Sequence, residues 1–195
     1  LLTTIPDAVG AGMRLYANTQ AWTLEHSGGR VSTVKARVLK PDSARPTGVN
    51  VTVRAKVVVA SGGAINSPAL LLRSGINPNG RVGHRTMIHP VIGVPALFSE
   101  EIAGFYGAPQ SAASHQFDDR GAKVGFFIET APTQPMLAGA AFPALSPAQI
   151  AFMRRLPHLS MLISLHIDGL HAGSPGGVVS VREDGSPKVD YPVTP

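Results

Sequence analysis

The sequence predicts a mixed α/β fold, α+β in character, in which a β-meander leads into a buried strand and a helix and is followed by a second, mainly antiparallel sheet. Three observations support this. Apolar and polar residues alternate over residues 13–60, a continuous apolar run then meets a glycine turn and a helical stretch, and strand-like pieces separated by Gly and Pro fill the rest.

The meander is expected from four alternating segments with turn residues between them. Ser27, Gly28 and Gly29 form one turn, and the Pro-containing stretch 41–48 separates the last two segments. Alternation places every second side chain on the same face, as in a strand with one buried face. The predicted strands are Arg14–Ala17, Ala21–Glu25, Val31–Val38 and Val49–Val53.

The pattern changes at Val57–Ala60, which is apolar without alternation. Such a run is typical of a strand buried on both faces of a parallel sheet. A helix over Pro68–Ser74 is expected next, because Ser67 suits the N-cap, proline suits the first helical position and Gly75 suits the end. Strand, glycine turn and helix together make half of a βαβ unit.

The second half of the chain is expected to form a mainly antiparallel sheet with long connections. One helix is predicted from Pro147 to Arg155 with Ser146 as its cap. The predicted strands are Val91–Phe98, Lys123–Glu129, Met161–Ile167 and Val178–Arg182.

Composition excludes several classes of protein. With 44% hydrophobic and 15% charged residues the chain has a globular balance, and without cysteine it has no disulfide or thiolate metal site. The net charge is +5, but Lys and Arg are scattered and only 6% of residues are aromatic, which argues against nucleic-acid binding. No apolar run reaches the roughly 18 residues of a membrane span.

The segment Ser61–Ile76 carries the most information. A strand that ends in small residues lets a nucleotide approach the backbone, because no side chain blocks the way, and Gly62 and Gly63 supply that clearance. The helix that follows can direct N–H groups toward an anion, although Pro68 removes one donor. The competing interpretation is a tight strand-to-helix turn without a ligand.

This segment closely resembles the second signature of the glucose-methanol-choline oxidoreductases, with Asn77 where that pattern ends in Gly. Weaker similarities lie around it. Ala17–Leu24 resembles the family strand whose backbone lies against the adenine of FAD, and Val82–Pro90 and Gly185–Tyr191 resemble two further family segments.

The resemblance implies an FAD-binding, Rossmann-like domain over residues 1–90 and a substrate-binding domain over residues 91–195. It implies FAD as cofactor and an alcohol, sugar or polyol as the small-molecule substrate, with hydride transfer to flavin. By position in the matching segments, the resemblance assigns cofactor binding to Ala21, Ser61, Gly62 and Gly63.

No catalytic residue is assigned in this chain. The family's Gly-x-Gly-x-x-Gly loop for the FAD pyrophosphate does not occur in it, and no residue is assigned to the family's catalytic histidine. The flanks, which start at Leu1 without Met and stop at Pro195, lead us to expect an interior fragment that is inactive alone. A non-catalytic nucleotide-binding module is the alternative, and a nicotinamide-dependent dehydrogenase is disfavoured because no Gly-rich loop precedes a suitably spaced acidic residue.

Other chemistry finds little support. His166 and His171, with Asp168 between them, match neither the helical i,i+4 pair nor the usual zinc spacings. We therefore expect no metal site. No Gly-x-Ser-x-Gly elbow occurs, so a hydrolase triad lacks its nucleophile.

Overall fold

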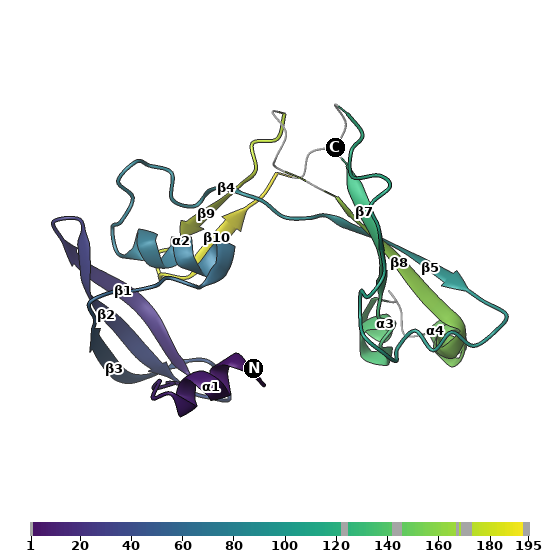
Figure 1. Cartoon of the computed structure of the whole chain (residues 1–195), viewed down its shortest axis with the longest axis horizontal. Helices are drawn as coiled ribbons and strands as arrows, with labels where there is room; N and C mark the ends of the chain where they lie inside the picture. The colour runs from purple at the N-terminus through teal and green to yellow at the C-terminus, as the bar shows by residue number, and fades with distance from the viewer. Residues whose placement is uncertain (1, 122–124, 142–145, 167, 169–172, 193–195) are drawn as a thin grey trace. The chain divides into compact units, whose positions relative to one another are not determined.

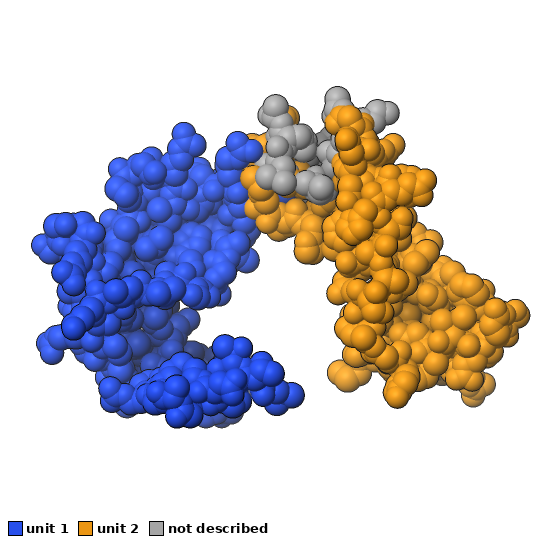
Figure 2. Space-filling model, in the orientation of Figure 1, with its two compact units in different colours: residues 1–86, 177–192 blue, residues 87–176, 193–195 orange. Residues whose placement is uncertain are grey.

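The structure is a computed structural model that describes residues 2–121, 125–141, 146–166, 168 and 173–192. Its elements form two compact units, coloured separately in Figure 2. Unit 1 contains residues 1–86 and 177–192, and unit 2 contains residues 87–176 and 193–195. The chain therefore leaves unit 1, builds unit 2 and returns.

Unit 1 opens with a short helix, α1 (Thr4–Gly10), which the sequence analysis did not predict, and continues into an antiparallel sheet of order β1-β2-β3. Its strands are β1 (Thr19–Ser27), β2 (Arg30–Leu39) and β3 (Pro46–Arg54). The meander prediction is thus confirmed for three of its four strands. The β1–β2 turn has positive φ at Gly28 (+56°) and Gly29 (+75°), which glycine adopts without strain.

The fourth predicted strand, Arg14–Ala17, is wrong, because these residues form a connection before β1. The predicted parallel strand at Val57–Ala60 is also wrong. The segment pairs with no other strand among the described residues, and Val57 and Val59 are 77% and 78% exposed. A strand needs a neighbour on at least one edge, and every strand pair in the described chain is antiparallel and lies elsewhere.

Helix α2 spans Gly63–Arg73, so it starts five residues before the predicted position and contains Pro68 inside it. The expected N-cap at Ser67 is therefore wrong, whereas the expected end at Gly75 is confirmed. Gly75 has φ +70°, its N–H bonds Leu72 O at 3.0 Å, and the Ile76 N–H bonds Leu71 O at 2.9 Å. These two bonds form a Schellman motif.

A second antiparallel sheet completes unit 1, with strand order β10-β9-β4. It joins β4 (His84–Thr86), near the middle of the chain, to β9 (Gly177–Val181) and β10 (Pro187–Asp190), near its C-terminal end. Helix α2 packs against β1 and against β9 and β10 (Figure 1). The apolar core of the unit is small, and its most buried side chains are Ala69 (0% exposed) and Val179 (1%).

Unit 2 is built on a four-stranded antiparallel sheet of order β5-β8-β7-β6. Its buried core includes Ala138, Leu156 and Leu159, packed against Phe152 and Met153. The strands expected at Val91–Phe98, Lys123–Glu129 and Met161–Ile167 are confirmed where the structure describes them. The strand expected at Val178–Arg182 is present as β9, but it belongs to unit 1. The helix capped by Ser146 is confirmed, since Ser146 Oγ accepts from Gln149 N–H at 3.4 Å. The elements of unit 2 are β5 (Val91–Leu97), β6 (Ala113–Ser114), β7 (Phe126–Ala131), α3 (Pro135–Ala141), α4 (Pro147–Arg154), a 3-10 helix (Leu156–His158) and β8 (Leu159–His166).

No described helix has both the length and the apolar character needed to cross a membrane.

One close contact fixes the turn between β9 and β10 against the meander. Gly185, with φ +81°, lies directly against the Trp22 ring, and a Cβ at this position would overlap Trp22 Cζ2. Gly48 in β3 has a similar φ of +89° but open space around it. A substitution at Gly48 therefore tests backbone strain alone, whereas the same substitution at Gly185 tests backbone strain together with a steric clash against Trp22.

We expect Gly48→Ala to lower the free energy of unfolding by about 1–2 kcal/mol, the cost of a side chain in the left-handed region. Gly185→Ala should cost about 1–3 kcal/mol more, because Trp22 must also move. Urea unfolding followed by circular dichroism measures both. Equal losses in the two variants would contradict the packing role of Gly185.

Candidate functional site

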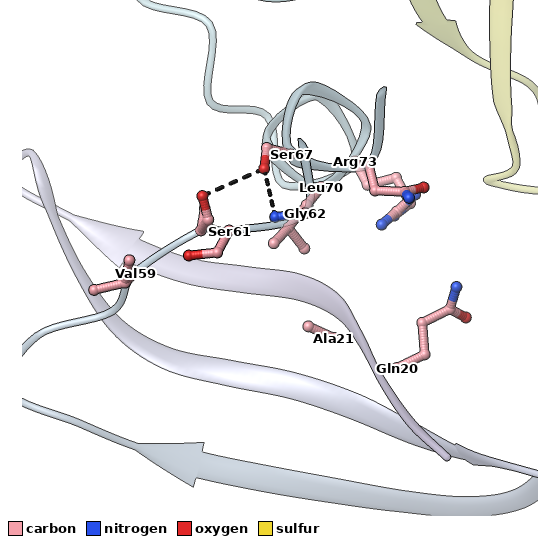
Figure 3. A pocket seen from close by; sticks show the side chains of 10 residues that line it. Gln20, Ala21, Val59, Ser61, Gly62, Ser67, Leu70 and Arg73 are labelled. Atoms are coloured by element: carbon pink, nitrogen blue, oxygen red, sulfur yellow. Dashed lines mark hydrogen bonds between the residues drawn. The ribbon is translucent and has the colours of Figure 1, made fainter. Parts of the chain in front are cut away.

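A pocket of about 330 Å³ lies in unit 1 between β1 and α2 (Figure 3). This volume is within the range of small-molecule sites. Strand β1 and helix α2 form two of its walls, and the extended segment before α2 forms a third. The residues that line it are Gln20, Ala21, Val59, Ala60, Ser61, Gly62, Asn66, Ser67, Leu70 and Arg73.

Three of the four residues expected to bind a cofactor lie together in this pocket. Ala21 comes from β1, while Ser61 and Gly62 come from the segment that enters α2. They are forty residues apart in sequence, and the packing of α2 against β1 brings them to one cavity. Gly63 does not line the pocket, and its φ of +73° is a sufficient reason for glycine there.

The loop at the start of α2 is held by Ser67. Its Oγ accepts from Gly62 N–H at 2.8 Å and donates to Ala60 O at 3.3 Å, as the dashed lines in Figure 3 show. Gly62 is tightly placed, because a Cβ would lie 3.1 Å from Asn66 Cβ and from Ser67 N. The hydroxyl therefore fixes the pocket wall where the chain turns into the helix.

The opposite end of the pocket carries positive charge. Arg73 donates from Nε to Trp22 O at 2.8 Å and from Nη1 to Gly185 O at 3.1 Å. Partial burial lowers the pKa of the Arg73 guanidinium from its ordinary value, and the nearby charge of Arg37 lowers it further. The guanidinium carbons of Arg37 and Arg73 lie 3.3 and 4.3 Å from the centroid of the Trp22 ring.

The sequence analysis missed the polar residues of this wall, Gln20, Asn66 and Arg73. Arg73 belongs to the signature-like segment, but the pattern leaves its position open, so nothing in that pattern marked it. Gln20 precedes Ala21 on β1, and only the register of β1 with β2 shows that it faces Arg37.

The remaining titratable residues do not form a second centre in the part of the chain that is described. No group of three His, Asp or Glu side chains there is arranged to hold a metal ion. Asp168 is buried and accepts from Ser174 Oγ at 3.2 Å, and His166 Nε2 lies 3.1 Å from Ser164 Oγ. His171 lies outside the described residues.

The pocket thus combines small residues at the start of α2 with the polar side chains of Gln20, Asn66 and Arg73. Comparison with known proteins identifies the family. The profile described as GMC oxidoreductase matches residues 1–91. An uncharacterized GMC-type oxidoreductase of Mycobacterium tuberculosis, represented by two strains, is 31% identical over 194 residues, which is all of this chain and 28% of that protein.

A further uncharacterized GMC-type oxidoreductase, from Sinorhizobium fredii, is 39% identical over 101 residues, which is 52% of this chain and 19% of that protein. The chain belongs to the GMC oxidoreductase family. It spans 28% of the length of the mycobacterial relatives it matches. The N-terminal domain of this family has a Rossmann-like FAD-binding fold, and this chain is of the mixed α/β class.

We expect Ser67→Ala to loosen the pocket wall, because the variant loses the bond to Gly62 N–H. The free energy of unfolding should fall by about 0.5–1 kcal/mol, and the Gly62 amide should exchange with solvent faster. Hydrogen exchange followed by NMR measures the local effect. Ser67→Thr keeps the hydroxyl and is the control, and unchanged exchange in Ser67→Ala would contradict the role of this side chain.

Proposed function

We propose that the protein is an FAD-dependent oxidoreductase that oxidises an alcohol, sugar or polyol hydroxyl, and that this chain supplies the adenosine side of its cofactor site. One observation carries the proposal: Ala21, Ser61 and Gly62 meet at one pocket between β1 and α2. Family membership supports the oxidoreductase class.

The residues present fit the adenosine part of FAD. Ala21 and Gly62 expose little beyond backbone at the pocket wall, so a flat ring can approach the chain closely. A pocket of about 330 Å³ is too small for the whole dinucleotide but adequate for its nucleoside end. When bound, the flavin would supply the acceptor for the hydride removed from the substrate.

In this function, residues 1–90 belong to the FAD-binding domain and residues 91–195 to the substrate-binding domain. The compact units support a boundary near the first of these limits, because unit 1 holds the pocket and its first segment ends at residue 86. Residues 177–192 return to unit 1, where β9 and β10 pack on α2. In this proposal they support the cofactor wall.

A non-catalytic nucleotide-binding module is the second candidate. It is favoured by the absence of an assigned catalytic role for any of the residues that line the pocket. The two candidates differ in one property, because only the oxidoreductase reduces its bound flavin when an alcohol or sugar is added.

We expect Ala21→Leu to lower FAD occupancy several-fold in the form of the protein that binds FAD, because the larger side chain fills the pocket. Gly62→Val should act in the same direction, with an added stability loss because its Cβ crowds Asn66 and Ser67. Flavin absorbance per protein after gel filtration measures occupancy.

The matched control is Ala17→Leu, an exposed alanine outside the pocket, which should keep full occupancy. Equal occupancy in wild type, Ala21→Leu and Gly62→Val would refute the placement of the adenosine.

The 195-residue chain on its own should show no dehydrogenase activity. The reason is that it encodes no Gly-x-Gly-x-x-Gly loop and has no assigned catalytic residue. Dye reduction with added FAD and a panel of alcohols and sugars should stay at background. Sustained turnover would show that the catalytic groups are inside this chain.

A further inference from the structure

We propose that Gln20 recognises the 6-amino edge of adenine and that Arg37 is the positioning residue that fixes its orientation. The inference rests on the proposed function, since it assigns a base-selecting contact to the same pocket. Gln20 lines the pocket beside Ala21. Its side-chain amide extends into the space between β1 and α2 in Figure 3.

The sheet register brings the two side chains together. Gln20 on β1 pairs directly with Arg37 on β2, and side chains at such positions lie close enough to interact. Arg37 Nε donates to Gln20 Oε1 at 2.8 Å. The Arg37 guanidinium is itself held over the Trp22 ring, with its central carbon 3.3 Å from the ring centroid.

This contact decides which way the amide faces. A glutamine amide can usually turn over and exchange its oxygen and nitrogen, but a guanidinium only donates hydrogen bonds. Turning the Gln20 amide over would place its NH₂ group against the Arg37 donor and lose the bond. The oxygen therefore stays with Arg37, and the NH₂ group lies on the side of Arg73 (Figure 3).

A fixed donor beside an acceptor matches adenine. The NH₂ group of Gln20 can donate to a ring nitrogen, and the second lone pair of Oε1 can accept from the 6-amino group. Hypoxanthine has the same shape but carries an oxygen at position 6, so two acceptors would then face each other. A freely turning glutamine would adapt to this base, whereas one held by Arg37 cannot.

The test uses the form of the protein that binds FAD, stripped of flavin, with adenosine 5′-diphosphate and inosine 5′-diphosphate as competitors of FAD rebinding. The wild type should prefer the adenosine compound by about tenfold or more. Arg37→Met keeps a long side chain but loses the donor, and it should bring the preference within about twofold. Arg37→Lys keeps a donor and should retain part of the preference.

Gln20→Ala is the second variant, because Gln20 is exposed on an edge strand and its truncation leaves the fold intact. It should also abolish the preference. An unchanged preference in Gln20→Ala or Arg37→Met, or no preference in the wild type, would overturn the inference while leaving FAD binding as proposed. If neither FAD nor adenosine 5′-diphosphate binds to the wild type, the proposed function fails as well.

Discussion

The arrangement of unit 1 depends on one side chain, Arg73. It is the last residue of α2, and its guanidinium bonds the carbonyl of Trp22 in β1 and that of Gly185 in the β9–β10 turn. These three elements come from distant parts of the chain. A planar guanidinium with several donors can join them, which a lysine ammonium on a flexible stem would do less well.

The sizes of the side chains on and before α2 explain why a pocket exists in a unit with so small an apolar core. Ala69 faces inward and is fully buried, so α2 comes close to the sheet at that point. Ser61 and Gly62 precede the helix and Ser67 lies within it, and their small side chains leave space beside β1. Small residues around the start of α2 therefore leave a cavity beside β1, and this cavity extends along the helix to Leu70 and Arg73.

Much of this arrangement is visible in the sequence, for physical reasons that differ between elements. Alternation and the Gly28-Gly29 turn identify β1 and β2 because both signals are local. The end of α2 is predictable since Gly75 can adopt a positive φ. These features need no knowledge of the rest of the chain.

The errors arise where a local pattern depends on distant partners. An apolar run such as Val57–Ala60 becomes a strand only beside other strands, and the described residues supply none there. Serine is a residue type that often caps a helix, but the Ser67 hydroxyl instead accepts from Gly62 N–H and donates to Ala60 O, both of which precede it in the chain. The small pocket residues were predictable, because a ligand can approach the backbone closely only where side chains are small. The places of Gln20 and Arg73 in the pocket could not be predicted, because the first depends on the register of β1 with β2 and the second on tertiary contacts.

The return of the chain to unit 1 has a consequence for how the protein is made. Thr86 at the end of β4 pairs with Gly177 at the start of β9, so the point where the chain leaves unit 1 and the point where it returns are neighbours in one ladder. During synthesis, β4 therefore leaves the ribosome long before its partner. Unit 2 can close on itself in the interval, because its own strands and helices lie between those two points. Unit 2 can therefore gain or lose residues over evolution without a change in the β4–β9 register that completes unit 1.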